Sequence, residues 1–184
     1  FTDTPKPSRA WGTALNVPQR SQRSEDAKIA SRICSPTSLG MVMAFWGRSL
    51  DTPRVASGVY DKAAELYGNW SFNVAFASTH GLRATASHLD GLQDVEREIA
   101  AGRPVVISHR YGKGELKASP ISETEGHLIV VVGFTKTGDV IVNDPAANPA
   151  RGQKIRRVYD RAEFLKTWQG NAEGVAYLLS PLKN

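Results

Sequence analysis

Apolar residues are distributed differently in the two halves of this 184-residue chain. In the first half they recur at helical spacing or fill whole segments, which predicts helices over residues 34–46, 52–67, 72–78 and 92–101. In the second half they form short runs bounded by Gly, Pro and polar residues, which predicts strands over residues 104–108, 127–134, 140–143 and 174–179. Helices followed by an antiparallel sheet are typical of the α+β class.

Two segments carry more information than the others. Residues 34–46 are apolar on nearly every side, which is typical of a helix buried at the centre of a domain. Residues 135–138 predict a four-residue hairpin loop between two of the strands. Before this hairpin, residues 110–126 predict a long loop, which is a candidate substrate-facing element because long loops in compact domains often carry function.

Composition bounds the domain organisation and the classes of partner. Residues 1–16 are rich in Pro, Thr and Ser and predict a linker or N-terminal extension, which would suit a junction to a further N-terminal domain. Residues 17–184 predict one domain. The net charge of +5 comes without a groove-reading motif, so we expect a solvated basic face and no nucleic-acid partner. No apolar run approaches the roughly 20 residues that span a bilayer.

The single cysteine, Cys34, stands at the predicted N-terminus of the buried helix. The positive end of the helix dipole favours a thiolate there, which makes Cys34 a candidate nucleophile. The alternative is that Cys34 is a small buried hydrophobic residue, as most lone cysteines are. One cysteine also excludes an intramolecular disulfide and a zinc module built on several cysteines.

A cysteine nucleophile needs a base, and the base needs a group that orients it. His127 opens one strand of the hairpin and Asp144 follows the other. With Phe134 opposite Asp139 at the turn, His127 and Asp144 fall on one face as diagonal neighbours, about 7–8 Å apart at Cα. Asn143 points to the opposite face in this register and would take the place of Asp144 if a β-bulge shifted the strands.

Hydrolysis of an acyl group also needs donors for the developing oxyanion. The backbone N–H of Cys34 is one candidate, and the side-chain amides of Gln19 and Gln22 are two more. Three further histidines have no convincing ligand partner in the sequence and are interpreted as surface or hydrogen-bonded residues rather than metal ligands: His80, His88 and His109.

Six segments resemble those of the C39-like branch of the papain-like cysteine peptidases, of bacterial type, and they occur in the order of that family. They are VPQRSQ (17–22), ICSPTSLGMVMAFWG (33–47), AAGRPVVIS (100–108), GHLIVVVGF (126–134), VIVNDPAAN (140–148) and RAEFLKTW (161–168). Well-known members are domains of bacteriocin exporters that cut leader peptides after a double glycine. This sequence shows no membrane or ATPase segment of such an exporter, so that role is not carried over.

The resemblance implies a papain-like fold, in which a central N-terminal helix packs on an antiparallel sheet. It implies Cys34 as nucleophile, His127 as general base and then acid, and Asp144 as the group that orients His127. The glutamine of the family's oxyanion hole follows a Val-Pro pair by four residues, which selects Gln22 over Gln19. The interval from Gln22 to Cys34 is longer than is common in the family. The mechanism requires no metal and no cofactor.

Three functions compete within this fold. The first is a peptidase that acts on a peptide or protein substrate. The second is an amidase or acyltransferase that uses the same triad on a small amide or a cell-wall peptide, and the third is a catalytically silent peptide-binding module. Because Cys34, His127 and Asp144 are all present, the sequence argues against the silent binding module. We expect a monomer that is exported to the periplasm or the exterior, with the cytoplasm as the alternative.

Overall fold

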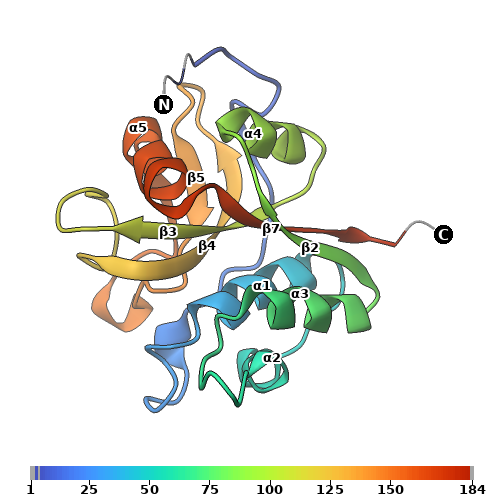
Figure 1. The fold of residues 1–184 in the computed structure, drawn as a ribbon. Coiled ribbons are helices and arrows are strands. Elements are labelled where there is room, and N and C mark those ends of the chain that lie inside the picture. The colour runs from blue at the N-terminus through green and yellow to red at the C-terminus, as the bar shows by residue number, and fades with distance from the viewer. Residues whose placement is uncertain (1–2, 4, 183–184) are drawn as a thin grey trace.

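The computed structural model of the chain describes residues 3 and 5–182. Figure 1 shows a central sheet with α1, α2 and α3 on one side and α4 and α5 on the other. The helices are α1 (Cys34–Phe45), α2 (Thr52–Val59), α3 (Trp70–Thr79), α4 (Leu92–Ala100) and α5 (Arg161–Leu165), with the short helical segments η1 (Gln22–Ser24), η2 (Pro149–Arg151) and η3 (Lys166–Gly170). The strands are β1 (Thr13–Ala14), β2 (Leu82–His88), β3 (Val105–Tyr111), β4 (Thr124–Phe134), β5 (Val140–Asn143), β6 (Arg156–Tyr159) and β7 (Val175–Pro181). The predicted architecture, a central N-terminal helix on an antiparallel sheet, is confirmed.

The strands form one sheet in the order β2-β7-β3-β4-β5-β6, and β1 adds to β4. Every pair along this path is antiparallel. β3 and β4 lie at the centre, so helices cover both of their faces. Because β4 and β5 are neighbours, the first residues of β4 come close to the residues that follow β5.

The two faces of the central strands belong to two separate apolar cores. Val106 and Val130 pack with Leu39 of α1 on one face. Ile107 and Ile129 point to the other face, towards α4 and α5. Burial on both faces explains why these strands appear in the sequence as unbroken apolar runs and not as an alternating pattern.

The β4–β5 hairpin departs from the predicted register at its turn. Phe134 pairs with Val140, so the loop comprises five residues, 135–139. A bulge in β4 then takes up the one-residue difference, and Val130 pairs with Asn143 as the predicted register requires. The bulge therefore leaves the relation between the start of β4 and the end of β5 as predicted.

The helix predicted over residues 52–67 ends at Val59. Asp61 accounts for the early end, because its carboxylate accepts hydrogen bonds from the backbone N–H groups of Ala63 (3.0 Å) and Ala64 (3.1 Å). These bonds offer the backbone a turn in place of further helix.

Three strands were not predicted, namely β1, β2 and β6, and the central strands β3 and β4 are longer than predicted. β2 and β6 lie at the two edges of the sheet. Most side chains of β2 are exposed, β6 carries two arginines, and neither strand has an apolar run. β3 extends to Tyr111 and β4 begins at Thr124, which shortens the predicted loop 110–126 to residues 112–123.

The extension predicted over residues 1–16 packs on the sheet where the structure describes it. β1 pairs with β4, and Ala10 is buried. Gly133 of β4 is required by this contact, because a Cβ atom there would lie 2.0 Å from the carbonyl oxygen of Thr13. Residues 1, 2 and 4 of the extension, and 183–184 of the predicted domain 17–184, lie outside the described residues, and the division after residue 16 stays a prediction.

Candidate active site

Cys34 is the first residue of α1 and is partly exposed. Ile33 precedes the helix and gives it no side-chain cap, so the first backbone N–H groups can serve another acceptor. The backbone N–H groups of Ser35 and Leu128 both help to lower the pKa of the Cys34 thiol. One turn further, the Ser38 hydroxyl donates to the carbonyl oxygen of Leu128 at 2.9 Å. This bond holds the first turns of α1 against β4, next to His127.

His127 lies in β4, and its side chain is buried. The ring atom Nε2 is 2.8 Å from Oδ1 of Asp144, the residue that follows β5. A carboxylate only accepts hydrogen bonds, so Nε2 carries a hydrogen and Nδ1 remains for the Cys34 thiol. The thiol is coupled to His127 by a hydrogen bond and by charge. The structure thus brings together the three residues that the sequence nominates from α1, β4 and the end of β5.

Asp144 is buried, and both of its carboxylate oxygens accept hydrogen bonds. Its Oδ2 accepts the hydroxyl of Tyr159 at 2.5 Å, and its Oδ1 accepts the backbone N–H of Ala146 at 2.9 Å in addition to His127. Burial raises the pKa of Asp144, but the charge and hydrogen bond of His127, together with the other two donors, lower it overall. The carboxylate is therefore ionised and fixed in orientation.

The pKa values of Cys34 and His127 move in opposite directions. Burial raises the pKa of the Cys34 thiol, yet the hydrogen bond and charge of His127 outweigh burial and lower it below its ordinary value. Burial lowers the pKa of His127, but the charge and hydrogen bond of Asp144, followed by those of Cys34, raise it to about 10. Both shifts favour a thiolate–imidazolium pair at neutral pH.

Asn143, the alternative to Asp144, has other partners. Its Nδ2 donates to the carbonyl oxygen of Val17 at 3.2 Å, and its Oδ1 accepts from Nε of Arg156 at 3.0 Å. Asn143 therefore joins β6 to the segment that precedes η1, and the structure places Asp144 and not Asn143 against His127.

Gln22, in η1, lies against the loop that carries Asp144. Its backbone N–H donates to the carbonyl oxygen of Pro145 at 2.9 Å, and its Nε2 donates to the carbonyl oxygen of Ala30 at 2.8 Å. The amide is buried and has a second N–H on Nε2. Gln19 is exposed, and its Oε1 accepts the backbone N–H of Arg156. Of the two glutamines, Gln22 is the one held beside Asp144.

His109 is a buried histidine that the sequence analysis did not place near the site. It is the cross-strand partner of His127, and its Nδ1 is 2.9 Å from Oγ1 of Thr167. The Thr167 hydroxyl donates to backbone carbonyls of α5, so Nδ1 of His109 is the donor of that bond. Its Nε2 has no hydrogen-bond partner among the described residues. Burial, followed by the charge of His127, lowers the pKa of His109 to about 3, which keeps this ring neutral.

The other two histidines bond to backbone carbonyls. Nδ1 of His80 is 2.8 Å from the oxygen of Phe76, and Nδ1 of His88 is 2.9 Å from the oxygen of Glu173. Within residues 3 and 5–182, no three His, Cys, Asp or Glu side chains are arranged to hold a metal ion. The same residues include no helix that is both long and apolar enough to cross a membrane.

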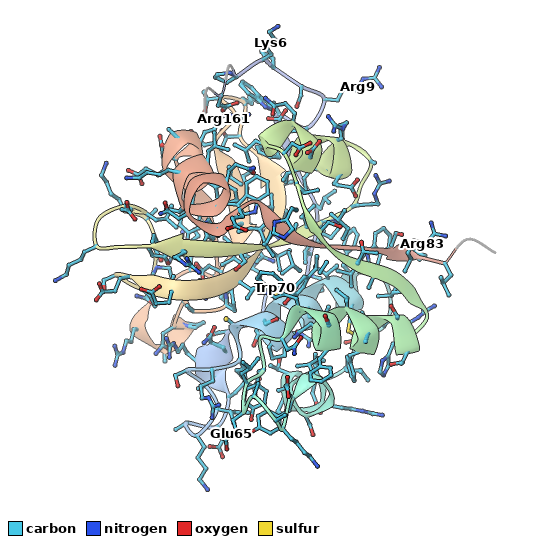
Figure 2. All side chains as sticks on the ribbon, in the orientation of Figure 1. Lys6, Arg9, Glu65, Trp70, Arg83 and Arg161 are labelled. Atoms are coloured by element: carbon cyan, nitrogen blue, oxygen red, sulfur yellow. The ribbon has the colours of Figure 1, made fainter. Side chains whose placement is uncertain are left out.

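A cavity of about 440 Å³ opens beside Cys34. Its walls come from β3, β4, the segment between η3 and β7, and the loop before α3. Figure 2 labels Trp70 at the start of α3, where the lower helices meet the sheet. The partly exposed thiol therefore faces a space of the size that binds small ligands and peptide side chains.

Comparison with solved structures identifies chains of the same fold. A C39-like peptidase from Bacillus anthracis superposes with a TM-score of 0.67 at 16% identity, covering 93% of this chain and 98% of that one. A double glycine motif protease from an AMS/PCAT transporter, in complex with the leader peptide, gives 0.58 at 18% identity, covering 92% and 94%. The peptidase domain of Streptococcus ComA, a bifunctional ABC transporter, gives 0.56 at 17% identity, covering 83% and 93%.

Comparison at the level of sequence gives a family. None of the curated proteins matches the chain. The sequence model of the Peptidase_C39 like family matches residues 14–174, which include Cys34, His127 and Asp144. The match extends over most of the chain and contains every structural element from α1 to η3. The chain belongs to the Peptidase_C39 like family.

Proposed function

We propose that this protein is a cysteine peptidase-like hydrolase that cleaves peptide bonds through Cys34, His127 and Asp144 by way of a thioester acyl-enzyme. The observation that carries the proposal is the contact series in which Asp144 bonds to His127 at 2.8 Å and His127 in turn is coupled to a partly exposed thiol. A nucleophile, a base and an orienting carboxylate in this order are the components of nucleophilic acyl transfer.

In the first half-reaction, Cys34 gives its proton to Nδ1 of His127, and the thiolate attacks the carbonyl carbon of the substrate. The tetrahedral oxyanion is stabilised by the backbone N–H of Cys34 and the free N–H of the Gln22 amide. His127 then transfers its proton to the leaving nitrogen as the C–N bond breaks. The products are a free amine and a thioester on Cys34.

In the second half-reaction, His127 takes a proton from a water molecule, whose oxygen attacks the thioester carbonyl. The C–S bond breaks, the carboxylic acid leaves, and Cys34 recovers its proton from His127. Asp144 remains ionised throughout and stabilises the imidazolium in both halves, because its oxygens accept only from fixed donors. Each residue thus has one role that its contacts support.

The relatives support a peptide substrate over a small amide. One solved structure of the same fold is a protease in complex with a leader peptide, and this chain belongs to the Peptidase_C39 like family. The second candidate, an amidase or acyltransferase, uses the same half-reactions and differs only in the substrate and the final acceptor. A silent binding module would have no use for the opposed pKa shifts of Cys34 and His127.

Alkylation by iodoacetamide tests the nucleophile, and Cys34 is the only cysteine, so the label reports on it alone. We expect the midpoint of the pH–rate profile to lie well below 8 and to move to a higher pH in His127→Ala. A midpoint near 8.5 in the parent protein, the value of an ordinary thiol, would contradict the proposal.

Digestion of a peptide library tests the reaction itself. We expect cleavage by the parent protein and none by Cys34→Ala, which removes the nucleophile and keeps the helix. Binding of peptides without cleavage by the parent protein would favour the silent module. Hydrolysis confined to small amides, or transfer of the acyl group to an added amine in preference to water, would favour the amidase or acyltransferase.

A further inference from the structure

The cavity beside Cys34 lies on one side of the three site residues. β3, β4 and the segment before β7 form its floor, whereas Asp144 follows β5, on the other side of β4. Cys34 lines the cavity, and neither His127 nor Gln22 does. The cavity therefore extends from the thiol away from the base and the oxyanion donor.

This position determines which part of a substrate the cavity can receive. In the reaction proposed above, the leaving nitrogen takes a proton from His127, so the amine side of the scissile bond lies against His127. The acyl side leaves the Cys34 sulfur in the other direction. Side chains on the acyl side, N-terminal to the scissile bond, are therefore those that reach the cavity.

One wall of the cavity is apolar and aromatic. It consists of Leu66, Tyr67 and Trp70, and we call it the aromatic wall. Leu66 is 38% exposed and Trp70 is 41% exposed, which is high for large apolar side chains. The Tyr67 ring has two neighbours, the Tyr60 ring at 4.7 Å between centroids and the Arg32 guanidinium at 5.6 Å from the ring centre.

The segment that leads into the aromatic wall is held by hydrogen bonds. The backbones of Asp61 and Leu66 exchange two hydrogen bonds, at 2.9 and 3.2 Å. The Asp61 carboxylate also accepts the side-chain amide of Asn69 at 2.8 Å, just before α3 begins. The wall is therefore formed before any ligand arrives, which reduces the ordering cost of binding.

The aromatic wall is also connected to the start of α1. The Asn73 side chain, which is buried, donates to the carbonyl oxygen of Tyr67 at 2.8 Å. The same side chain accepts the hydroxyl of Ser35, the residue next to Cys34, at 2.8 Å. These two bonds, one buried and one partly buried, connect the wall to the residue next to the nucleophile.

The charged residues around the cavity are of both signs. Arg32 and Arg110 line it together with Glu125 and Glu173, so the formal charges cancel. Nε of Arg110 lies 3.9 Å from Oε2 of Glu125, which pairs two of the four. The cavity thus offers no net charge to a ligand, and its apolar wall favours an uncharged side chain.

We propose that the cavity between Cys34 and the aromatic wall binds a bulky, uncharged apolar side chain at one of the first two positions on the acyl side of the scissile bond. The proposal rests on the proposed function and adds the substrate class to it. The substrate is then a peptide with a large aliphatic or aromatic residue near its cleavage point, and two small residues there would leave the aromatic wall exposed to water.

Irreversible peptidyl acyloxymethyl ketones test this inference, because the acyl-side residue can be changed while the electrophile stays the same. We would compare probes with Gly, Phe, Leu, Glu or Lys at the first position and then at the second. The measurement is the second-order rate constant for labelling Cys34. We expect Phe or Leu to exceed Gly, Glu and Lys by about tenfold or more at one of the two positions.

Trp70→Ala and Phe72→Ala form a matched pair of variants. Both residues are exposed aromatics of α3, at 41% and 43%, but only Trp70 lines the cavity. We expect Trp70→Ala to reduce the advantage of Phe over Gly by about tenfold. Phe72→Ala should leave it within about twofold, as is usual for a surface substitution away from a site.

The outcomes separate the inference from the function on which it rests. If the probes label Cys34 much faster than iodoacetamide but Gly reacts as fast as Phe and Leu, the substrate class is wrong and the nucleophile stands. If an apolar preference exists and Trp70→Ala leaves it unchanged, the aromatic wall is not its source. If no probe reacts faster than iodoacetamide and no peptide is cleaved, both the function and the inference are overturned.

Discussion

Replacement of Asp144 by Asn isolates the charge of the buried carboxylate. Asp144 accepts hydrogen bonds from His127, Tyr159 and the backbone of Ala146. The amide of Asp144→Asn has the same shape, and its oxygen can still accept from His127 and Ala146. The hydroxyl of Tyr159 can turn to accept from the new amide nitrogen, because a phenol both donates and accepts. The substitution therefore removes the charge and keeps the contacts.

The size of the effect follows from the two pKa shifts. The rise for His127 from 6.5 to about 10 has Asp144 as its main favourable cause. At about 1.4 kcal/mol for each pH unit, this rise corresponds to about 5 kcal/mol in favour of the imidazolium. Without the carboxylate, the main cause of the rise is lost, and burial lowers the pKa of His127. Cys34 then faces a neutral imidazole at pH 7, and its own pKa rises towards or above the ordinary value of about 8.5.

Alkylation by iodoacetamide between about pH 4 and pH 10 measures this change. The quantity to compare is the midpoint of the profile, because the intrinsic nucleophilicity of a thiolate also changes with its pKa. We expect the midpoint to lie below that of an ordinary thiol in the parent protein and at or above about 8.5 in Asp144→Asn. Asn143→Ala is the matched control, since it removes the neighbouring side chain and should leave the midpoint unchanged. A midpoint in Asp144→Asn that stays within half a pH unit of the parent value would refute the reasoning.

Two further predictions concern Gln22 and His109. Gln22→Ala should lower the rate of peptide hydrolysis by about 10²–10³-fold and leave the alkylation rate of Cys34 unchanged, because only hydrolysis forms an oxyanion. Equal hydrolysis rates in the parent protein and Gln22→Ala would show that Gln22 is not an oxyanion donor. Burial lowers the pKa of His109 to about 3 in the folded protein, so at mildly acidic pH the ring takes up a proton when the chain unfolds. The contribution of His109 to stability is therefore lost as the pH falls below 6.5, the ordinary pKa of histidine. In urea denaturation, the unfolding free energy of the parent protein relative to His109→Phe should therefore fall by about 2 kcal/mol from pH 7 to about pH 5, and parallel pH profiles would contradict the assignment.

The sequence was sufficient to predict those parts of the fold that depend on local pattern. The buried helix 34–46, the strands of the main hairpin and the α+β class follow from apolar runs and their period. The edge strands β2 and β6 could not be found in this way, because an edge strand has one open side and carries polar residues. The early end of α2 depends on the carboxylate of Asp61, whose competing hydrogen bonds leave no trace in the apolar pattern.

In the β4–β5 hairpin, the predicted pairing near Asp144 is correct although the predicted turn is wrong. The loop is one residue longer than the four residues predicted, which alone would have turned Asp144 to the other face. The bulge in β4 next to Gly133 restores the pairing, and Gly133 is itself required by the approach of Thr13 in β1. The N-terminal extension is thus coupled, through one glycine, to the register that sets Asp144 against His127.

His109 and the aromatic wall could not be predicted, because both depend on contacts between distant segments. His109 lies in β3 after three apolar residues and Ser108, but its neighbour in the fold, His127, is its partner only across the strand pair. The aromatic wall lies in the loop before α3 and at the first residue of α3, and Asn73 and Ser35, two polar residues with no distinctive spacing, connect it to the start of α1. Cys34, His127 and Asp144 can be found in a single sequence, because their residue types and their places in the predicted helix and strands are local features. The residues of the aromatic wall and the burial of His109 can be recognised only once the helices and strands are packed together.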